Sequence, residues 1–371
     1  MAFDAASDPR DSDRQTGEQK TRRMKLLSRL QARIGRSWRH ARARASFRHI
    51  AGPRRFDLAD DDAVVVVVVK DGAYHLPYFL DWHRGLGFNK FVIVDNLSRD
   101  TTLDIAKASP DTIVASCSAD FSRLEPCIRY YANTLYTRGG WNLMVDVDEL
   151  FEYPRAATVP LRMFLRNLNA QGATGVIAQM LDFFPRRFAD LPPGIDFKAA
   201  VDRMDRFDLA SIVHKEYDDP DIGFSYFMAQ NTRASRRTNF MFGGIRAAVF
   251  GETCCLTKHP LFRHTADVIP GEHPHVSRPL HCADFTCLLR HYKFTGDYVA
   301  RDLHRADHDR FDTDEYALRA ARFRDRGVIE FHRETSVRYQ GFDDLIARGF
   351  LVAPPPDSAP APSSDTPYST D

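Results

Sequence analysis

The sequence predicts an α/β protein with a mixed, mostly parallel sheet that is covered by helices. Two observations predict this fold. Four short segments are predicted to be strands: residues 64–69, 90–95, 112–116 and 141–145. The first is a continuous run of valines, as expected of a strand buried on both faces. Segments with apolar residues at helical steps separate these runs, and strands that alternate with helices form a largely parallel sheet wound on both sides.

A basic arm precedes this region. Residues 1–20 are polar and are predicted to be disordered. Residues 21–56 hold twelve of the 51 lysine and arginine residues and none of the 50 acidic ones, which leaves 39 basic against 50 acidic residues, a net charge of −11, elsewhere. Within residues 22–50, apolar side chains recur at steps of three and four and predict an amphipathic helix: Met24, Leu27, Leu30, Ile34 and Trp38.

Two interpretations of this arm stay open. A basic amphipathic helix over residues 22–50 fits the surface of an anionic membrane. It equally fits a helix that packs on the body of the protein and exposes its basic side to water. Nucleic acid is a weaker third interpretation, and we predict no such partner, because aromatic residues are not interleaved with the charges and the body is acidic.

The elements after the arm follow from periodicity and composition. Apolar spacing predicts helices over residues 74–86, 100–107, 125–138, 154–169 and 312–326, and a further strand over residues 175–182. Asp100 is able to cap the second of these helices. Residues 353–371 are rich in proline, serine and alanine and are predicted to be disordered. We therefore expect a single domain over residues 57–352, between an arm of residues 1–56 and this tail.

Cysteine usage and hydropathy indicate the compartment. The six cysteines contain no Cys-x-x-Cys pair and predict free, mostly buried thiols in a reducing environment. No apolar run approaches the roughly 18–20 residues that span a bilayer. The N-terminus lacks the basic and apolar regions of a secretory signal. These features predict a cytoplasmic protein, with the arm as the element that would bring it to the inner face of a membrane.

Three predicted strands end in polar turns. Residues 70–72 follow the first strand, residues 95–100 the second and residues 146–148 the fourth. Ligands of such sheets bind beyond the carboxyl ends of the strands. We therefore expect one crevice to collect all three turns.

The third turn holds Asp146 and Asp148, with Glu149 directly after them. In an extended backbone, side chains two residues apart share a face, so both carboxylates are expected to converge on one cation. Oxygen ligands of this kind suit Mn²⁺ or Mg²⁺, commonly with a phosphate that shares the ion. The alternative is an exposed acidic turn without a ligand.

These residues, taken in order, resemble glycosyltransferase family 2-like proteins of the GT-A type. The resemblance is carried by residues 69–87, by the Asp-Asn-x-Ser-x-Asp-x-Thr turn at residues 95–102 and by the Asp-x-Asp-Glu motif at residues 146–149. Residues 243–246, 258–261 and 289–294 resemble the distal segments of the family, so the likeness covers roughly residues 63–300. It implies a GT-A type, Rossmann-like sandwich and a metal-dependent, inverting transfer of a sugar from a nucleotide-sugar donor.

The resemblance also implies roles for individual residues. Asp146 would lie near the ribose and the metal, Asp148 would coordinate the ion, and Asp95 and Asp71 would contact the base or ribose. The sequence departs from the family at Gly72, where a glutamate is usual, and at Thr101, where a glycine is usual.

A histidine from the second half of such domains often completes the metal site. Six histidines fall within residues 259–291, and His275 and His291 are our candidates, against the alternative of hydrogen-bonded structural imidazoles. Lys293 and Arg246 are candidate diphosphate contacts. Glu272 and Asp284 are candidates for the general base that inversion requires, against the alternative of ordinary surface acids. The acceptor, whether saccharide, lipid or protein, stays open.

Two other functions are considered. The departure at Gly72 allows a catalytically inactive scaffold or nucleotide-binding protein that keeps the GT-A fold. A strand that ends in Asp-x-Asp also occurs in haloacid-dehalogenase-like phosphohydrolases. Those enzymes need threonine or valine where Leu150 stands, and they carry the motif on the first strand, so we rank this function last.

Overall fold

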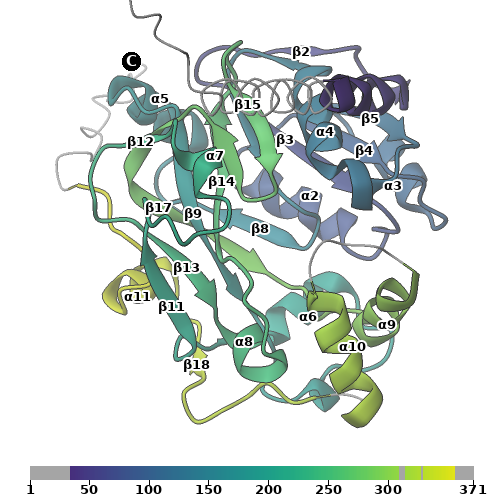
Figure 1. Cartoon of the computed structure of the whole chain (residues 1–371), viewed down its shortest axis with the longest axis vertical. Helices are drawn as coiled ribbons and strands as arrows, with labels where there is room; N and C mark the ends of the chain where they lie inside the picture. Colours follow the sequence, from purple (N-terminus) through teal and green to yellow (C-terminus); the bar gives the residue numbers. More distant parts are fainter. Residues whose placement is uncertain (1–33, 309–313, 327–328, 356–371) are drawn as a thin grey trace, which may run out of the picture.

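The computed structural model describes residues 34–308, 314–326 and 329–355, and its centre is a mixed sheet of ten strands (Figure 1). The strands lie in the order β1 (Phe47–Ala51), β5 (Thr112–Cys117), β4 (Phe91–Asp95), β3 (Ala63–Val69), β7 (Trp141–Met144), β14 (Thr257–Arg263), β9 (Gly175–Asp182), β17 (His281–His291) and β12 (Thr232–Arg233). Strand β8 (Glu149–Glu152) pairs with β17 off this path. The predicted α/β class with a large mixed sheet is confirmed.

The first half of the sheet is parallel, and the valines of its central strand β3 are buried on both faces. Strands β5, β4, β3 and β7 pair in parallel. Alternate residues of β3 enter different cores: Val65 and Val67 pack with the helices α2 and α5, while Val64 and Val66 pack with α4. These helices span Leu76–Gly85, Leu161–Ala170 and Phe121–Thr134. A continuous run of β-branched residues is therefore buried on both faces, as predicted.

The second half of the sheet is mixed, and it brings later parts of the chain close to the end of β7. Strand β14 runs antiparallel to β7 and β9, and β17 pairs in parallel with β9 and antiparallel with β8. The register places His291 opposite both Asp182 and Glu149. Three residues from distant parts of the sequence thus meet at one edge of the sheet.

Smaller elements surround this sheet. Two-stranded sheets pair β2 (Phe56–Asp57) with β6 (Thr137–Arg138), β10 (Arg206–Phe207) with β18 (Val337–Arg338), β11 (Ile212–Glu216) with β13 (Asn239–Gly243), and β15 (Ile269–His273) with β16 (Val276–Arg278). The other helices are α3 (Thr102–Ala108), η1 (Phe188–Asp190), α6 (Phe197–Arg203), α7 (Ser225–Met228), α8 (Ile245–Phe250), α9 (Tyr298–His308), α10 (Glu315–Arg326) and α11 (Phe342–Ala347). Figure 1 shows α6, α8, α9 and α10 grouped at one end of the molecule.

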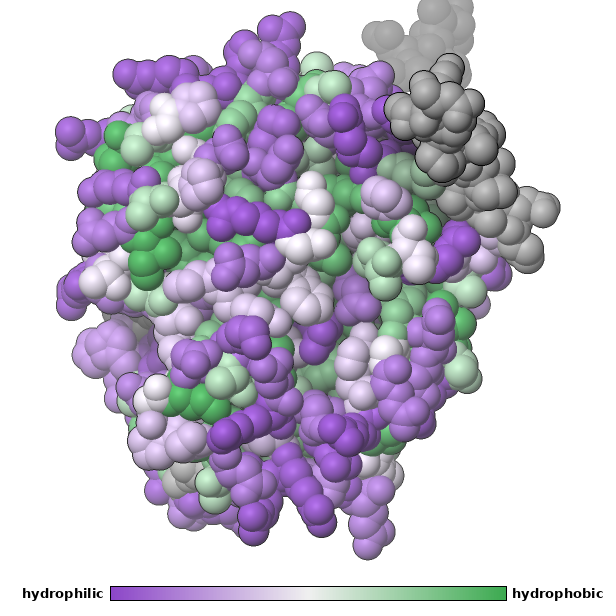
Figure 2. All heavy atoms as spheres, turned by 180° about the vertical axis from the view of Figure 1, so that it is seen from behind, coloured by the Kyte–Doolittle hydropathy of each residue, from purple (hydrophilic) through white to green (hydrophobic). Residues whose placement is uncertain are grey.

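An aromatic cluster holds this helical group together. Phe250 of α8, Phe323 of α10 and Tyr298 of α9 share a buried core with Phe294 and Phe331. The face turned away from the viewer in Figure 1 is mostly hydrophilic, and hydrophobic side chains form small patches on it (Figure 2).

The arm differs from its prediction. Residues 34–45 are helical, but the helix ends at Ala45, and β1 then pairs antiparallel with β5. The expected helix up to residue 50 is wrong because the backbone of β1 forms hydrogen bonds with the edge of the main sheet instead. Part of the arm therefore belongs to that sheet. Residues 1–33 and 356–371, which include the stretches predicted to be disordered, lie outside the described residues.

Other expectations are confirmed with shifted ends. The helix expected over residues 125–138 is α4, which begins at Phe121 because the Asp120 carboxylate accepts a hydrogen bond from the Ser122 amide at 3.0 Å. The helix expected over residues 154–169 begins only at Leu161. All six cysteines are free and buried. Among the described helices, none is both long and apolar enough to cross a membrane.

Candidate functional site

The turns that follow β3 and β4 are joined by hydrogen bonds. The Asp71 amide donates to Ser98 Oγ at 2.8 Å, and Asp71 Oδ1 accepts from the Arg99 amide at 2.7 Å. Asp95, which is buried, accepts from the Ser98 amide at 3.3 and 3.2 Å. The structure thus brings Asp71 and Asp95 together around one short segment.

The turn after β7 lies beside these two. A Cβ atom built on Gly72 would lie 3.9 Å from Val147 Cγ1 and only 2.2 Å from Val69 Cγ2. The second distance is far below any normal contact, so a side chain at position 72 would require Val69 to shift. The three polar turns are neighbours, as the sequence predicts.

Asp146 forms two ion pairs. Arg129 Nη2 lies 2.9 Å from Asp146 Oδ1, and Lys258 Nζ lies 3.2 Å from Asp146 Oδ2 and 2.5 Å from Glu149 Oε1. Burial favours the neutral acid, but the charges of Arg129 and Lys258 outweigh it and hold the pKa of Asp146 below its usual range. Both oxygens of Asp146 are thus engaged by cations of the protein.

Asp148 faces a different partner. Its Oδ2 lies 3.6 Å from His291 Nε2. Strand β7 ends at Met144, and the Glu149 amide donates to the Asp146 carbonyl at 3.0 Å, so residues 146–149 form a turn. The expectation that Asp146 and Asp148 share a face of an extended strand is therefore wrong: the turn directs the two carboxylates to separate partners.

The carboxylate of Asp182 orients the imidazole of His291. Its Nδ1 lies 2.6 Å from Asp182 Oδ1, and the other oxygen of Asp182 accepts from Arg246 Nε at 2.9 Å. Burial opposes a charge on His291, but Asp148 and Asp182 outweigh it and raise the pKa of the imidazole. Asp148, His291, Asp182 and Arg246 form one continuous chain of contacts.

Basic side chains lie near the Asp148 end of this chain of contacts. Lys293 and His75 act electrostatically on Asp148, and Asp148 acts in turn on Arg305 of α9. Arg305 Nη1 donates to the Tyr316 hydroxyl at 2.6 Å, and Lys293 Nζ lies 5.8 Å from the centre of the same ring. Strand β17, α9 and α10 therefore meet beside Asp148.

Four predicted site residues lie elsewhere or in other contacts. Arg246 is 3% exposed and reaches Asp182 and Glu252, so its guanidinium supports the site from within. His275 is half-buried, and its Nδ1 lies 3.0 Å from the Thr257 carbonyl oxygen, beside Lys258 rather than Asp148.

The two candidate bases both contact arginines. Glu272 Oε2 lies 2.5 Å from Arg278 Nη2, and Asp284 Oδ2 lies 2.9 Å from Arg237 Nη2. Asp284 precedes His291 by seven residues on β17, which separates them by about 23 Å of extended strand. The structure therefore brings together Asp71, Asp95, Asp146, Asp148, His291 and Lys293, but not Asp284.

Several residues of the site carry signals that the sequence reasoning did not use. Asp182 is the last residue of an otherwise apolar buried strand. Lys258 lies within β14, whose residues are nearly all buried, and Arg129 is buried on the core side of α4. A charged residue inside an apolar pattern is costly without a partner, and that cost is the available signal.

A divalent cation at this site would have two protein ligands, Asp148 and His291. In the described part of the chain, no three histidine, cysteine or acidic side chains converge as a metal site. Asp148 and His291 nevertheless face each other, and the carboxylate on His291 Nδ1 is the arrangement that usually orients a metal-binding imidazole. Mg²⁺ is commonly held by one or two protein ligands, with phosphates and waters completing its shell.

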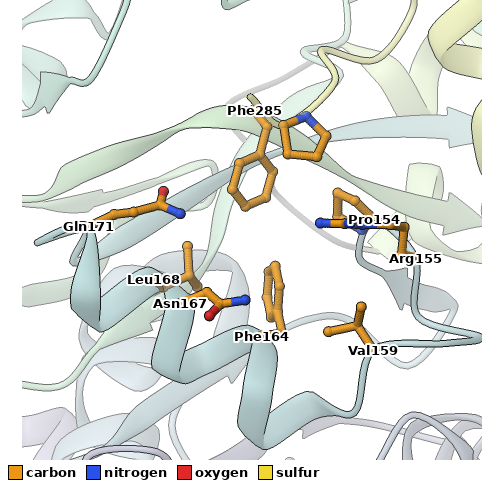
Figure 3. A pocket seen from close by; sticks show the side chains of 9 residues that line it. Pro154, Arg155, Val159, Phe164, Asn167, Leu168, Gln171 and Phe285 are labelled. Atoms are coloured by element: carbon orange, nitrogen blue, oxygen red, sulfur yellow. The ribbon is translucent and has the colours of Figure 1, made fainter. Parts of the chain in front are cut away.

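A separate small pocket lies between α5 and the start of β17 (Figure 3). Phe164 and Phe285 line it with their rings 5.9 Å apart, and Pro354 closes it. Its lining is mainly apolar and holds no carboxylate or histidine. This pocket is therefore no candidate for the chemistry of the acidic turn.

Comparison with known proteins gives no family assignment. No family model matches the chain, and no curated protein matches it significantly. The resemblance of the motifs to glycosyltransferases therefore stays a prediction from the residues themselves.

Proposed function

We propose that this protein is a metal-dependent glycosyltransferase of the GT-A type. It would move a sugar from a nucleotide-sugar donor to a saccharide, lipid or protein acceptor, with inversion. The observation that carries the proposal is the pair of Asp148 and His291, oriented by Asp182, at the sheet edge where the three polar turns meet.

The joined turns after β3 and β4 support a nucleoside site. Asp71 and Leu97 adopt left-handed φ angles of 53° and 61°, which are costly for residues other than glycine. Leu97 is also 55% exposed, so its side chain is available for an apolar contact. Backbone strain of this kind concentrates at ligand sites. We assign the ribose or base contact to Asp71 and Asp95 and the apolar contact to Leu97.

The cations beside Asp148 support a diphosphate site. Cleavage of a sugar nucleotide places negative charge on the departing diphosphate, and prearranged positive groups stabilise that charge. Lys293 and Arg305 are in position to do so. Asp148 and His291 would hold Mn²⁺ or Mg²⁺, which when bound supplies Lewis-acid stabilisation of the leaving group.

Asp146 takes a supporting role in this proposal. Its ion pairs with Arg129 and Lys258 fasten the turn to α4 and β14 and so position Asp148. Arg246 positions Asp182 in the same way from the other side. Glu272 and Asp284 are left without a role as base, because each is paired with an arginine.

The test uses the full chain with UDP-, GDP- and dTDP-sugars in the presence of Mn²⁺. Calorimetry measures donor binding, and release of the nucleoside diphosphate measures turnover. We expect metal-dependent binding of one donor class, lost in Asp148→Asn and in His291→Asn. Asp284→Asn is the matched control and should bind and turn over as the wild type does. Absence of binding to every donor, or loss of activity in the control alone, would contradict the proposal.

A second candidate is a nucleotide-binding protein without transferase activity. The specific observation in its favour is that both oxygens of Asp146 are already paired with cations of the protein. The same calorimetry separates the two functions, since this protein would bind nucleotide equally with and without Mn²⁺ and would release no product.

A further inference from the structure

The helix of residues 34–45 points an apolar stripe away from the protein. Ile34 is 61% exposed and Trp38 is 59% exposed, which makes them two of the most exposed large apolar residues in the described chain. At 3.6 residues per turn, Ile34, Trp38, Ala41 and Ala45 fall within about 60° of one another around the helix axis. Ala41 and Ala45 are exposed as well. The stripe is therefore continuous over three turns.

The opposite side of the same helix contacts the body. Ala43 is completely buried, and the His40 ring lies edge-on to Tyr130 and Tyr131 of α4, at centroid distances of 5.5 and 5.8 Å. His40 and Ala43 lie about 130° and 170° from the centre of the apolar stripe. A helix that simply packed its apolar face on the domain would have the reverse orientation.

Arginines border the outward stripe. Arg42 lies about 70° from the centre of the stripe on one side and Arg44 about 90° on the other, while Arg39 lies farther round beyond Arg42; all three are exposed. Arg42 is 5.3 Å from the centre of the Trp38 ring, and none of the three forms an ion pair with another described residue. Among the described residues, nothing neutralises these charges, and they are available to an external anionic surface.

We propose that this helix binds the surface of an anionic membrane, with Ile34 and Trp38 inserted among the lipids and the arginines on the headgroups. Exposed apolar residues on a helix bordered by basic residues are the features that place a helix in the membrane interface. Tryptophan is enriched at that depth. The same apolar spacing continues upstream in the sequence at Leu30, Leu27 and Met24, which lie outside the described residues.

Two other partners fit less well. Nucleic acid would use the arginines but would leave the outward apolar stripe in water. A second copy of the chain would need about 800 Å² of surface on each partner, which one narrow stripe does not offer. It would also bring like-charged arginines together. The helix lies at the end of the molecule away from α9 and α10 (Figure 1), so binding there is separable from donor binding.

The experiment is sedimentation of the full chain with phosphatidylcholine vesicles that contain or lack phosphatidylserine. We expect binding only to the anionic vesicles and a weakening by salt. Each basic residue near such a surface contributes about fivefold in affinity, so Arg42→Gln with Arg44→Gln should weaken binding about thirtyfold. Trp38→Glu should abolish it. Val213→Glu and Arg322→Gln, which change exposed residues of β11 and α10, are matched controls and should bind normally.

A second readout follows the inserted residue itself. Trp38 emission should shift to the blue on anionic vesicles, and Trp38→Phe should lose this shift while still sedimenting. Equal binding to both vesicle types, unchanged binding in the arginine variant, or preference for RNA or DNA over vesicles would overturn the proposal. So would a dimer that dissociates in Trp38→Glu without any vesicle binding. Donor titrations of the variants should match the wild type, which separates this proposal from the proposed function.

Discussion

Replacement of Asp146 by asparagine should act mainly on the stability of the fold, by lowering its free energy of unfolding, and only secondarily on metal binding. The carboxylate lies 2.9 Å from Arg129 and 3.2 Å from Lys258, whose side chains are only 6% and 9% exposed. Removal of one partner from a buried ion pair costs about 3–5 kcal/mol when the remaining charge has no other partner. Here Arg129 keeps Glu125 at 2.8 Å and Lys258 keeps Glu149 at 2.5 Å. We therefore expect a smaller loss, about 2–3 kcal/mol.

Urea unfolding at pH 7 measures this loss from the midpoint at an unchanged slope. The folded state holds the pKa of Asp146 below its ordinary value of 3.8, so the stabilisation by Asp146 is present above that pH and is lost as the pH falls below it. The difference from wild type should hence stay constant from pH 7 to about 5. Asp148→Asn is the comparison: its nearest charged partner, His291, is 3.6 Å away, beyond hydrogen-bond distance, so it should cost less than Asp146→Asn and yet abolish the Mn²⁺ effect. Greater destabilisation by Asp148→Asn than by Asp146→Asn would refute the reasoning.

Three further predictions follow from buried charges and from the cations of the site. Arg319→Met removes a completely buried guanidinium that is paired with two buried carboxylates, so it should cost about 3–5 kcal/mol in urea unfolding. The control Arg162→Met changes an exposed residue and should cost less than about 1 kcal/mol. Equal losses in the two variants would contradict this prediction. Burial lowers the pKa of His83 from 6.5 to about 4, so the unfolded chain takes up the proton first and stability falls as the pH drops from 6.5 to 4, by up to about 1.4 kcal/mol per pH unit for this residue. His83→Asn should flatten the dependence of the melting temperature on pH, and an unchanged slope would count against a neutral imidazole. Lys293→Ala and Arg305→Ala should each weaken donor binding about tenfold in calorimetry, while binding of the free nucleoside stays as in wild type; an equal loss for the nucleoside would place both residues elsewhere.

Much of the first half of the fold could be predicted because its signals are local. The valine run that became β3 needs no distant information to be identified as a strand buried on both faces. The turns after β3, β4 and β7 follow from their position at the ends of such strands. The arm shows the limit of this reasoning: its helix is expected to reach residue 50, but the edge of β5 offers hydrogen bonds that no local pattern reveals.

The site divides in the same way. Asp71, Asp95, Asp146 and Asp148 were identified because they lie at predicted strand ends, and their grouping follows from a parallel sheet. The partner of each acid could not be predicted. Lys258 is 112 residues from Asp146 and His291 is 109 residues from Asp182, so only the order and register of β14, β9 and β17 bring them together.

The sequence by itself determined where strands, helices and polar turns form, because those follow from backbone geometry and from the spacing of apolar side chains along a short stretch. Only the tertiary structure decided that Asp146 is paired with Arg129 and Lys258 while Asp148 faces His291. The physical reason is that the charge state and orientation of a buried carboxylate depend on groups within a few ångströms, and here those groups come from strands whose neighbours are set by long crossovers of the chain.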